Sequence, residues 1–319
     1  MNIANKKILV TGGAGFIGSH LAKKLMDLGH QVVVVDNFNS YYDPKLKEER
    51  ILKLFSGYNF ELKRVNIIDF ESLKKIFLES QIEIICHLAA QAGVRYSLKN
   101  PFIYEETNVR GTLNLLDLAK EFKIKGFIFA SSSSVYGASK KIPFSEDDPI
   151  RQPVSLYGAT KKAAEALVFS YHYLYKIPST ILRYFSVYGP FWRPDLALSK
   201  FVHAILNNQP IEVYNFGKMK RDFTYIDDIV EGTISAIEKN YPFEIFNLGN
   251  NHPIELNYFI ESIEKLLYKK AKKILLPIQL GEVPINWADI SKAQKLLNYH
   301  PKVSFEEGLR KTIDWFIHQ

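Results

Sequence analysis

Tyr157 and Lys161 lie four residues apart in the stretch PVSLYGATKKAAE, residues 153–165, where a helical pattern begins. Residues spaced by four share one face of a helix, so the phenol and the ammonium are expected to be neighbours. A cation about 5 Å from the phenol, at an effective dielectric of about 20, favours the phenolate by roughly 3 kcal/mol, or about two pKa units. The pair therefore predicts a tyrosine general base that works near neutral pH. The alternative is an amphipathic helix with a surface lysine.

Four serines follow a predicted strand in FASSSSVYG, residues 129–137. They fall at the carboxyl end of that strand, which is where ligands bind in parallel sheets. We expect Ser132 to hydrogen-bond the same substrate oxygen as Tyr157, and Ser133 is the second candidate. A serine cluster taken alone is more often a solvated turn.

A glycine-rich loop joins the first predicted strand to the first predicted helix. Gly12, Gly15 and Gly18 have the spacing G-x-x-G-x-x-G, and Phe16 and Ile17 lie between the last two glycines. Glycines allow the tight turn and let backbone N–H groups approach a pyrophosphate at the start of the helix. The loop therefore predicts a dinucleotide-binding site, against the alternative of a purely structural turn.

Two aspartates at strand ends extend this prediction. Asp36 ends the second predicted strand, where a carboxylate accepts both ribose hydroxyls and repels a 2′-phosphate, which favours NAD over NADP. Asp69 ends the stretch NIID after the third predicted strand. We expect it to contact the adenine or, alternatively, to cap the helix that follows.

Apolar runs alternate with helical patterns through the first 185 residues. The predicted strands are KKILVTG (6–12), QVVVVD (31–36), NFELKRV (59–65), IEIICHLAA (82–90), GFIFASS (126–132) and STILRYF (179–185). One predicted helix ends at Gly29, and the others lie near residues 70–80, 101–123 and 156–176. This alternation predicts an α/β fold with a doubly wound parallel sheet of the Rossmann type.

The pattern loosens after about residue 186, where prolines and glycines interrupt it. Helices are predicted at 197–208, 228–240, near 255–270 and at 305–318, with a last strand at 244–250. We predict an NAD-binding Rossmann domain made of residues 1–185 plus roughly 222–250. Residues 186–221 plus 251–319 are predicted to form a smaller, nucleotide-sugar-binding domain.

Composition narrows the function classes. The 319 residues are 47% hydrophobic and carry a net charge of +7. Lys and Arg alternate with Glu in DPKLKEERILKL (43–54), which predicts a solvated helix face, and no basic tract with interleaved aromatics indicates nucleic-acid binding.

Several other classes are disfavoured by motifs and residue counts. The single cysteine, Cys86, excludes an intramolecular disulfide, and the eight histidines show no metal-ligand spacing, so no metal is expected. No G-x-S-x-G elbow supports a hydrolase. The N-terminus lacks a signal-peptide pattern and no apolar run reaches the roughly 20 residues that span a bilayer. We therefore expect a soluble cytoplasmic protein.

These motifs together resemble the extended short-chain dehydrogenase/reductase family over nearly the whole chain. The segments that carry the resemblance are HLAAQAGVRYS (87–97), SSSSVYG (131–137), the stretch with Tyr157 and Lys161, YFSVYGPFWRPD (184–195) and GKMKRDFTYIDDIVEG (217–232). Within the family they closely resemble the bacterial and plant UDP-glucuronate 4-epimerases. The resemblance implies that Tyr157, Lys161 and Ser132 are catalytic. It also implies that Tyr184 lies beside the nicotinamide and that an LAA segment lines the cofactor, namely Leu88, Ala89 and Ala90.

Departures from related enzymes are informative. Nucleotide-sugar 4,6-dehydratases have an Asp–Glu pair directly before VYG, and the related UDP-glucuronate decarboxylases have a Glu there. This chain has Ser133 and Ser134 at these positions. UDP-glucose 4-epimerases usually have Asn at the position of Ser186, which we assign to substrate binding. Phe191 and Trp192 stand where the resembled epimerases commonly have Trp–Gly.

Further substrate contacts are assigned to cations and one aromatic ring. Arg193 is our candidate for a substrate carboxylate, because a guanidinium binds a planar anion through two hydrogen bonds. By resemblance Arg221 binds the pyrophosphate, with a salt bridge to a nearby acid as the alternative. Tyr214 is a candidate to flank the uracil, and Arg95 a candidate to reach the anionic substrate. Each of these residues has a structural role as its alternative.

The resemblance implies NAD-dependent epimerisation of a UDP-sugar at C4 through a 4-keto intermediate, with UDP-glucuronate converted to UDP-galacturonate. The alternatives are a UDP-glucose or UDP-N-acetylglucosamine 4-epimerase, a UDP-glucuronate decarboxylase, and a non-catalytic NAD-binding regulator. The resemblance also implies a homodimer, in which the helices near 101–123 and 156–176 pair with their copies, and a role in supplying surface polysaccharides. Neither nucleic acid nor a membrane is an expected partner.

Overall fold

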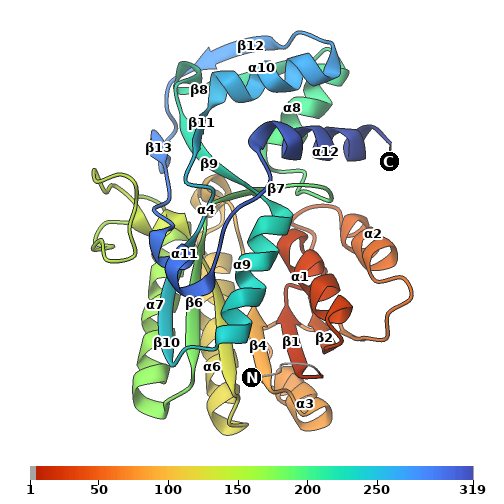
Figure 1. The fold of residues 1–319 in the computed structure, drawn as a ribbon, viewed down its shortest axis with the longest axis vertical. Coiled ribbons are helices and arrows are strands. Elements are labelled where there is room, and N and C mark those ends of the chain that lie inside the picture. The colour runs from red at the N-terminus through yellow and green to blue at the C-terminus, as the bar shows by residue number, and fades with distance from the viewer. Residues whose placement is uncertain (1–4, 319) are drawn as a thin grey trace.

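The computed structural model describes residues 5–318 of the chain, and within them seven parallel strands form one twisted sheet (Figure 1). In spatial order these strands are β10 (Phe243–Leu248), β6 (Ser179–Tyr184), β5 (Gly126–Ser132), β4 (Ile84–His87), β1 (Lys7–Thr11), β2 (Gln31–Val35) and β3 (Glu61–Lys63). The chain moves outward from β1 in both directions, so the strand order reverses between β1 and β4. The predicted doubly wound sheet is confirmed, and ligands bind at such a reversal in sheets of this kind.

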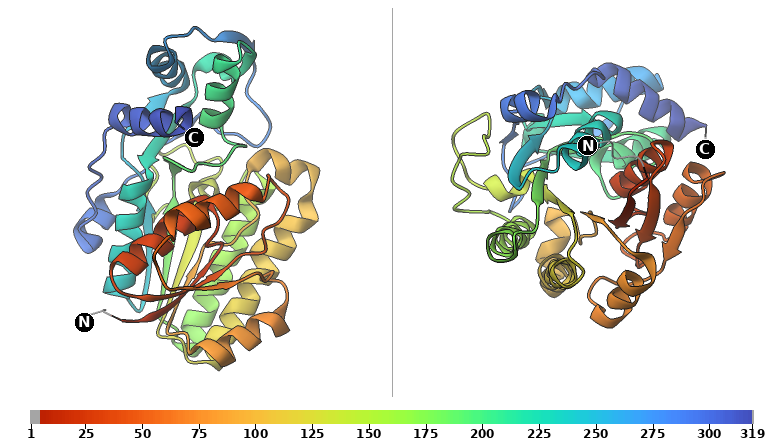
Figure 2. Two further views of the ribbon diagram at one scale, coloured as in Figure 1. Left: turned by 90° about the vertical axis from the view of Figure 1, so that its right-hand side faces the viewer. Right: turned by 60° about the horizontal axis from the view of Figure 1, so that its bottom comes forward.

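Helices cover both faces of this sheet, as the view from below in Figure 2 shows. One face carries α1 (Phe16–Asp27), α2 (Lys45–Leu54) and α9 (Ile226–Lys239), and the other carries α3 (Phe70–Ser80), α6 (Gly111–Glu121) and α7 (Leu156–Tyr175). Alternate residues of a strand point to opposite faces. Accordingly Val10 and Val34 join one buried cluster, while Leu9 and Val33 join the other. This two-sided burial explains why the strands are continuous apolar runs.

The helix predicted near 101–123 is divided into three parts. After α4 (Val94–Lys99) come α5 (Pro101–Glu105), a π-helical turn (Glu106–Arg110) and α6. Asn108 in the π turn is buried and donates to the carbonyl of Gln91 and to Thr160 Oγ1, both at 3.0 Å. The irregular turn therefore joins the segment after β4 to α7.

Two small sheets with three helices lie above the carboxyl ends of the parallel strands (Figure 1). One sheet contains β7 (Ser186–Tyr188), β9 (Lys220–Tyr225), β11 (Pro253–Glu255) and β13 (Ile285–Asn286), and the other pairs β8 (Pro210–Tyr214) with β12 (Lys272–Leu276). The helices are α8 (Ala197–Leu206), α10 (Leu256–Leu267) and α12 (Phe305–Ile317). Short 3₁₀ turns occur at Ser133–Tyr136 and Asn215–Gly217.

The chain returns to the parallel sheet twice after it has entered this upper part. First α9 and β10 add a helix and an edge strand, as expected for residues 222–250. Then α11 (Ser291–Leu297) packs against α9 and β10, although the sequence predicted residues 251–319 to belong to the smaller domain. The division into two domains stays a prediction, and α11 lies on the other side of its predicted boundary.

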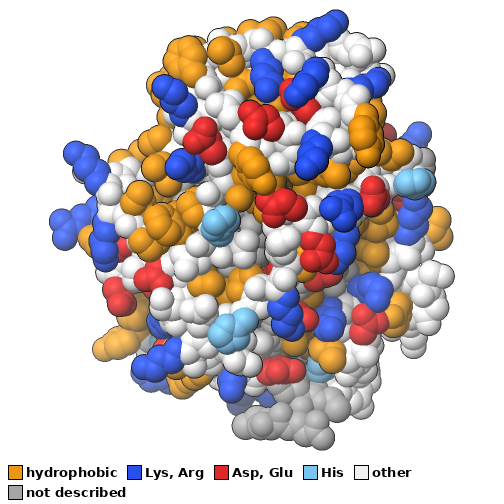
Figure 3. Space-filling model, turned by 45° about the horizontal axis from the view of Figure 1, so that its top comes forward, with side chains coloured by type: hydrophobic (Ala, Val, Ile, Leu, Met, Phe, Trp, Pro, Cys, Tyr) orange, Lys and Arg blue, Asp and Glu red, His pale blue; other side chains and the backbone are white. Residues whose placement is uncertain are grey.

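The prediction of a solvated face over residues 43–54 is wrong for α2. Lys47 and Arg50 are 6% and 1% exposed. Their hydrogen-bond partners belong to other parts of the chain, so both side chains turn towards the interior. Elsewhere basic and acidic side chains are interspersed, as on the face shown in Figure 3. Within residues 5–318 no helix is long and apolar enough to cross a membrane, and no three His, Cys, Asp or Glu side chains are grouped to hold a metal ion.

Candidate active site

A cavity of about 1110 Å³ lies between the carboxyl ends of the parallel strands and the upper part of the molecule. It brings together all of the residues that the sequence singled out, with one exception, Asp69. Those before α7 are Gly12, Gly15, Phe16, Ile17, Gly18, Asp36, Leu88, Ala89, Ala90, Arg95, Ser132 and Ser133. Those on α7 and after it are Tyr157, Lys161, Tyr184, Ser186, Arg193, Tyr214 and Arg221.

The glycine loop passes closely over the segment that follows β4. A Cβ on Gly12, whose φ is +66°, would lie 2.8 Å from the backbone of Ala89. A Cβ on Gly18 would overlap the carbonyl oxygen of Gly12. Side chains are therefore excluded where the backbone turns into α1, and the N-terminal N–H groups of that helix stay accessible at the cavity.

Asp36 is a buried carboxylate at the end of β2. It accepts hydrogen bonds from the backbone N–H of Ala14 at 3.2 Å and of Phe38 at 2.9 Å, and from Lys47 Nζ at 2.8 Å. The ammonium balances the charge of Asp36, which otherwise would be costly to bury. Both side chains also line the cavity, so the pair is in place to receive a polar ligand.

The adenine contact predicted for Asp69 is not supported by its position. Asp69 caps α3 by accepting from Ser72 N at 3.1 Å and from Ser72 Oγ at 2.6 Å, and it is not among the residues that line the cavity. Asn66 and Ile67 line the cavity instead. The chain turns at Asn66, so the last residue of NIID starts the helix rather than ending a strand.

These features fit the dinucleotide that the sequence predicts. The glycine loop leaves room only for backbone, Asp36 offers a carboxylate at the adjacent strand end, and Tyr184 and Leu88–Ala90 line the deeper part of the same cavity. The phenol of Tyr184 is held by Thr233 Oγ1 at 2.9 Å. The volume also exceeds the roughly 300–1,000 Å³ of a pocket for one drug-sized ligand, so it has room for a second molecule.

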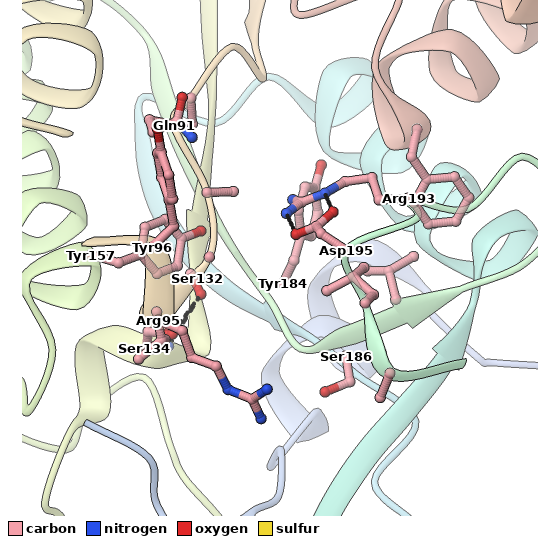
Figure 4. A pocket seen from close by; sticks show the side chains of 18 of the residues that line it. Gln91, Arg95, Tyr96, Ser132, Ser134, Tyr157, Tyr184, Ser186, Arg193 and Asp195 are labelled. Carbon is pink, nitrogen blue, oxygen red and sulfur yellow. Dashed lines mark hydrogen bonds and ion pairs between the residues drawn. The ribbon is translucent and has the colours of Figure 1, made fainter. Parts of the chain in front are cut away.

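Tyr157 meets the serines because α7 begins against them. Ser155 caps the helix by accepting from Gly158 N at 3.0 Å. A Cβ on Gly158 would lie 2.5 Å from the carbonyl oxygen of Ser134, so only glycine allows this approach. In Figure 4, Tyr157 and Ser132 lie together on one side of the cavity, and Ser132 is linked to Ser134 at 3.2 Å. We call Ser132, Tyr157 and Lys161 the reacting side.

The electrostatics of the reacting side differ from the prediction. Burial raises the pKa of Tyr157, and the nearby Ser132 hydroxyl and the positive charge of Arg193 oppose that rise. The sequence argument expected Lys161 to supply this effect. Instead its ammonium donates to the carbonyl of Ala130 at 2.8 Å, and burial lowers the pKa of Lys161 to about 7, while Glu165 opposes this change.

A buried ion pair lies behind Lys161. Glu165, one helical turn further along α7, accepts from Arg183 Nε at 3.0 Å and from Arg183 Nη2 at 2.9 Å. Its Oε1 also accepts from Ser131 Oγ at 2.5 Å. The network ties α7 to β5 and β6, and it places a negative charge near the ammonium.

Arg193 occupies the opposite side of the cavity (Figure 4). Its Nε and Nη2 donate to the two carboxylate oxygens of Asp195 at 2.9 and 2.5 Å. Tyr41 Oη donates to Asp195 Oδ2 at 3.1 Å. The guanidinium that the sequence assigned to a substrate carboxylate is thus already paired with an acid of the chain.

A second arginine is paired in the same way. Arg221 Nη2 donates to Glu282 Oε2 at 2.8 Å, and Arg95 Nε lies 3.9 Å from Glu282 Oε1. Arg95 also stacks over the ring of Tyr214, 4.5 Å from its centroid. Glu282 therefore contacts both Arg221, which was assigned to the pyrophosphate, and Arg95, which was assigned to the anionic substrate. We call Arg193 and Arg221, with their carboxylates Asp195 and Glu282, the binding side.

Ser133 and Ser186 also line the cavity. Ser133 Oγ accepts from Asn286 Nδ2 at 2.8 Å, while Oδ1 of Asn286 is buried and has no partner among the described residues. Because the Ser133 oxygen is already an acceptor, its own proton is free to be donated into the cavity.

The family model described as GDP-mannose 4,6 dehydratase matches residues 9–312. The chain belongs to this family. Relatives and structures that are similar to it cover nearly its full length. A UDP-glucuronate 4-epimerase from Thermodesulfobacterium geofontis is 47% identical over 96% of this chain and 95% of its own.

Two solved structures of similar proteins also hold nucleotide sugars. The UDP-glucuronic acid 4-epimerase from Bacillus cereus, solved with UDP-glucuronic acid and NAD, is 40% identical with a TM-score of 0.92, over 98% of this chain and 99% of that one. The UDP-glucose 4-epimerase from Thermotoga maritima, solved with UDP-glucose, is 33% identical with a TM-score of 0.90, over 98% and 99% of the two chains.

Several cavity residues of this dehydratase-family member were missed by sequence reasoning. They are Tyr41, Lys47, Asn66, Gln91, Asp195, Glu282 and Asn286. Asp195 lies two residues from Arg193, so an i, i+2 acid in RPD was an available signal. The pairing of Glu282 with Arg221 joins residues 61 positions apart, and nothing in the local sequence indicates it.

Proposed function

We propose that this protein is an NAD-dependent UDP-glucuronate 4-epimerase, which converts UDP-glucuronate to UDP-galacturonate. The observation that carries the proposal is the arrangement of one cavity, with Tyr157 and Ser132 on one side and Arg193 facing them from the other. The relatives that share nearly the full length of the chain and are described as UDP-glucuronate 4-epimerases support the same assignment.

The glycine loop, Asp36, Leu88–Ala90 and Tyr184 would hold NAD. Asp36 would accept hydrogen bonds from the ribose hydroxyls, Gly12, Gly15 and Gly18 would give the pyrophosphate access to backbone N–H groups, and Tyr184 would line the nicotinamide end of the site. When bound, NAD would supply a reversible hydride acceptor for C4 of the sugar. Asn66 replaces Asp69 in this proposal as the residue near the adenine.

Tyr157, as phenolate, removes the proton from the 4-hydroxyl, and Ser132 hydrogen-bonds the same oxygen. The buried phenol is hard to ionise, so it needs nearby positive charge. We assign that charge to Arg193, which opposes the rise in the pKa of Tyr157, and to Lys161 in its protonated form. After the 4-keto sugar has turned over, Tyr157 returns the proton to the oxygen.

The substrate carboxylate is assigned to Arg193, Ser133 and Ser186. Ser133 has a proton free to donate, and Arg193 keeps donors beyond the two that Asp195 engages. Holding the carboxylate firmly also opposes loss of CO₂ from the 4-keto acid, because the negative charge stays on its oxygens. The absence of an acid at Ser133 and Ser134 argues against dehydratase and decarboxylase chemistry.

Arg221 and Arg95 are assigned to the pyrophosphate and Tyr214 to the uracil. Arg221 and Arg95 share the partner Glu282, a carboxylate that lies where the proposal puts the phosphates. A bound diphosphate would take the place of Glu282 in these charge-assisted hydrogen bonds. The alternatives from the sequence, structural roles for each residue, remain the competing assignment.

UDP-glucose is the second candidate substrate. The charge of Arg193 is already balanced by Asp195, which makes a neutral sugar a plausible occupant of the same cavity. The deciding experiment incubates the purified protein with UDP-glucuronate, UDP-glucose and UDP-N-acetylglucosamine in turn and resolves the epimers by chromatography, with CO₂ release monitored. Galacturonate epimer without CO₂ supports the proposal, and turnover of the neutral sugars alone would reject it.

A homodimer is proposed on the surface made by α4, α5, α6 and α7. Large apolar side chains are exposed on these helices, among them Leu98 (58%), Phe102 (77%) and Phe169 (50%). Such side chains are costly to leave in water and are typical of an interface. Light scattering should give twice the monomer mass, and F102E should shift the protein towards monomer. A monomer at micromolar concentration would reject this assembly.

The cytoplasm and the two predicted domains are also proposals. A nucleotide-sugar substrate and a buried reduced thiol at Cys86 favour the cytoplasm, which fractionation of the source cells would test. The predicted domains are residues 1–185 with 222–250, and 186–221 with 251–319. Limited proteolysis would test the division.

A further inference from the structure

Arg50 is a buried guanidinium that makes four hydrogen bonds, three of them to backbone oxygens. Its Nε and Nη2 donate to the carbonyl of Phe191 at 3.1 and 2.9 Å, and its Nη1 donates to Tyr42 Oη at 2.8 Å and to the carbonyl of Ala14 at 3.3 Å. No ion pair to Arg50 occurs within residues 5–318. A charge that is 1% exposed without an acid partner is expensive, so its contacts are expected to serve a purpose beyond packing.

One of these contacts fixes the start of the turn that carries Arg193. Phe191 has a φ of +60°, a conformation that residues other than glycine rarely adopt. Two donors of Arg50 meet its carbonyl, and its ring packs against Trp315 at a centroid distance of 4.8 Å. The turn is therefore held in place by contacts from outside it.

The other end of the turn is held from the same part of the chain. Tyr41 Oη donates to Asp195 Oδ2, and Asp195 in turn holds the guanidinium of Arg193 through both of its oxygens. Tyr41 and Arg50 thus contact the residues on either side of Arg193. The third target of Arg50, Ala14, belongs to the glycine loop.

We propose that Arg50 and Tyr41 are positioning residues for Arg193, which fix its guanidinium relative to the glycine loop and so set the selectivity for a carboxylate on the sugar. The inference rests on the proposed function and deepens it. Neither residue needs to touch the reacting atoms. Arg50 connects the turn to the dinucleotide site, and Tyr41 orients the acid that orients Arg193.

Lysine cannot reproduce the contacts of Arg50. A planar guanidinium reaches three separate oxygens at fixed angles, whereas an ammonium is a point charge with three donors at one atom. R50K therefore keeps the charge and most of the length but releases either Ala14 or Phe191. Y41F removes one hydrogen bond, with the aromatic ring retained against Tyr96.

The test is a double-mutant cycle on the NAD-loaded protein, with R50K, R193A and the combined variant. Dissociation constants are measured by calorimetry for UDP-glucuronate and for UDP, which has no sugar carboxylate. We expect R50K to weaken UDP-glucuronate about tenfold and UDP less than about twofold, since losing a hydrogen bond to a charged group has effects of this order. In the R193A background R50K should add less than about twofold. KM should change more than kcat.

Two results with R50K would overturn the inference. One is that R50K weakens the binding of UDP and of UDP-glucuronate equally, which means a general effect on the fold. The other is that the effects of R50K and R193A on UDP-glucuronate binding multiply in the double variant. If R50K does not fold, Y41F replaces it in the test. We expect Y41F to weaken the binding of UDP-glucuronate about threefold and to leave the binding of UDP unchanged. No such loss in a folded Y41F would also reject it. A wild-type protein that binds UDP-glucuronate no better than UDP would instead reject the proposed function.

Discussion

The two sides of the cavity treat charge in opposite ways. On the reacting side, the ammonium of Lys161 meets a carbonyl oxygen, and Ser132 and Tyr157 have no carboxylate among their hydrogen-bond partners in the described residues. On the binding side, Arg193 is paired with Asp195 and Arg221 with Glu282. The cation of the first side has no acid as a hydrogen-bond partner within residues 5–318, although Glu165 lies near it, whereas the two arginines of the second side are paired before any ligand arrives.

This difference separates two tasks. A group that must help to ionise a phenol acts through unbalanced charge in a poorly solvated place. A group that must recognise an anion benefits from a fixed orientation, which a carboxylate partner provides at the expense of attraction for the incoming anion. Each of the following predictions tests whether the two sides are divided in this way.

Replacement of the reacting phenol should have the largest effect. Y157F removes the proton acceptor and should lower kcat for UDP-glucuronate by about 10³-fold or more, within reach of the general-base contribution. Epimer formation measured by chromatography is the readout, and NAD content of the purified variant is the control. Undiminished turnover would remove Tyr157 from the chemistry.

Loss of the Ser132 hydroxyl should be the next largest effect. S132A removes a hydrogen bond to the oxygen on which charge develops, and kcat should fall about 10²-fold with a smaller change in KM. S139A is the matched control, because Ser139 follows the serine turn and is not among the residues lining the cavity. An equal loss in both variants would contradict a specific role for Ser132.

Removal of a binding-side carboxylate should have a smaller effect of the opposite sign. E282Q frees Arg221 and Arg95, so UDP should bind about three- to tenfold more tightly, and the gain should shrink as salt is raised. E306Q is the control, since Glu306 bonds to Tyr258 and is not among the residues that line the cavity. Weaker binding in E282Q would show that orientation matters more than the balance of charge.

The smallest effect should be a shift in the pH profile of kcat/KM. Activity needs Tyr157 deprotonated and Lys161 protonated, so it falls on the alkaline side as Lys161, with a pKa of about 7, loses its proton. Glu165 raises that pKa, so E165Q should lower it and move the alkaline fall to lower pH by about half a unit to one unit. E121Q, on the surface, is the control. A shift to higher pH would contradict the assignment, and the lower melting temperature expected from unpairing Arg183 is checked separately.

The sheet and the reacting side could be predicted because their signals are local. A strand, a glycine loop and a helix follow one another directly, and Tyr157 and Lys161 are linked by the period of a single helix. His87 and Cys86, which end the apolar run that predicted this strand, are both buried in β4. In each case a few neighbouring residues contain the whole argument.

Most of what the sequence did not indicate depends on contacts between different elements, although Asp195 lies only two residues from its partner Arg193. Lys47 and Arg50 alternate with glutamates, which is typical of a solvated helix. They are buried because Lys47 pairs with Asp36 and Arg50 donates to the carbonyl of Phe191. Asp69 caps α3, which is the alternative that the sequence left open beside a contact with the adenine. The Ala130 carbonyl that accepts from the Lys161 ammonium comes from β5, so the helical spacing of Tyr157 and Lys161 could not indicate it.

The repeated return of the chain to the parallel sheet limits how such an enzyme changes its substrate. Because β10 and α11 come after segments of the upper part, no single contiguous stretch contains everything above the sheet. A whole recognition module therefore cannot be exchanged by one recombination event without also removing an edge strand. New specificities in this architecture are expected to arise by point substitutions in individual turns, such as the one around Arg193, while the scaffold stays intact.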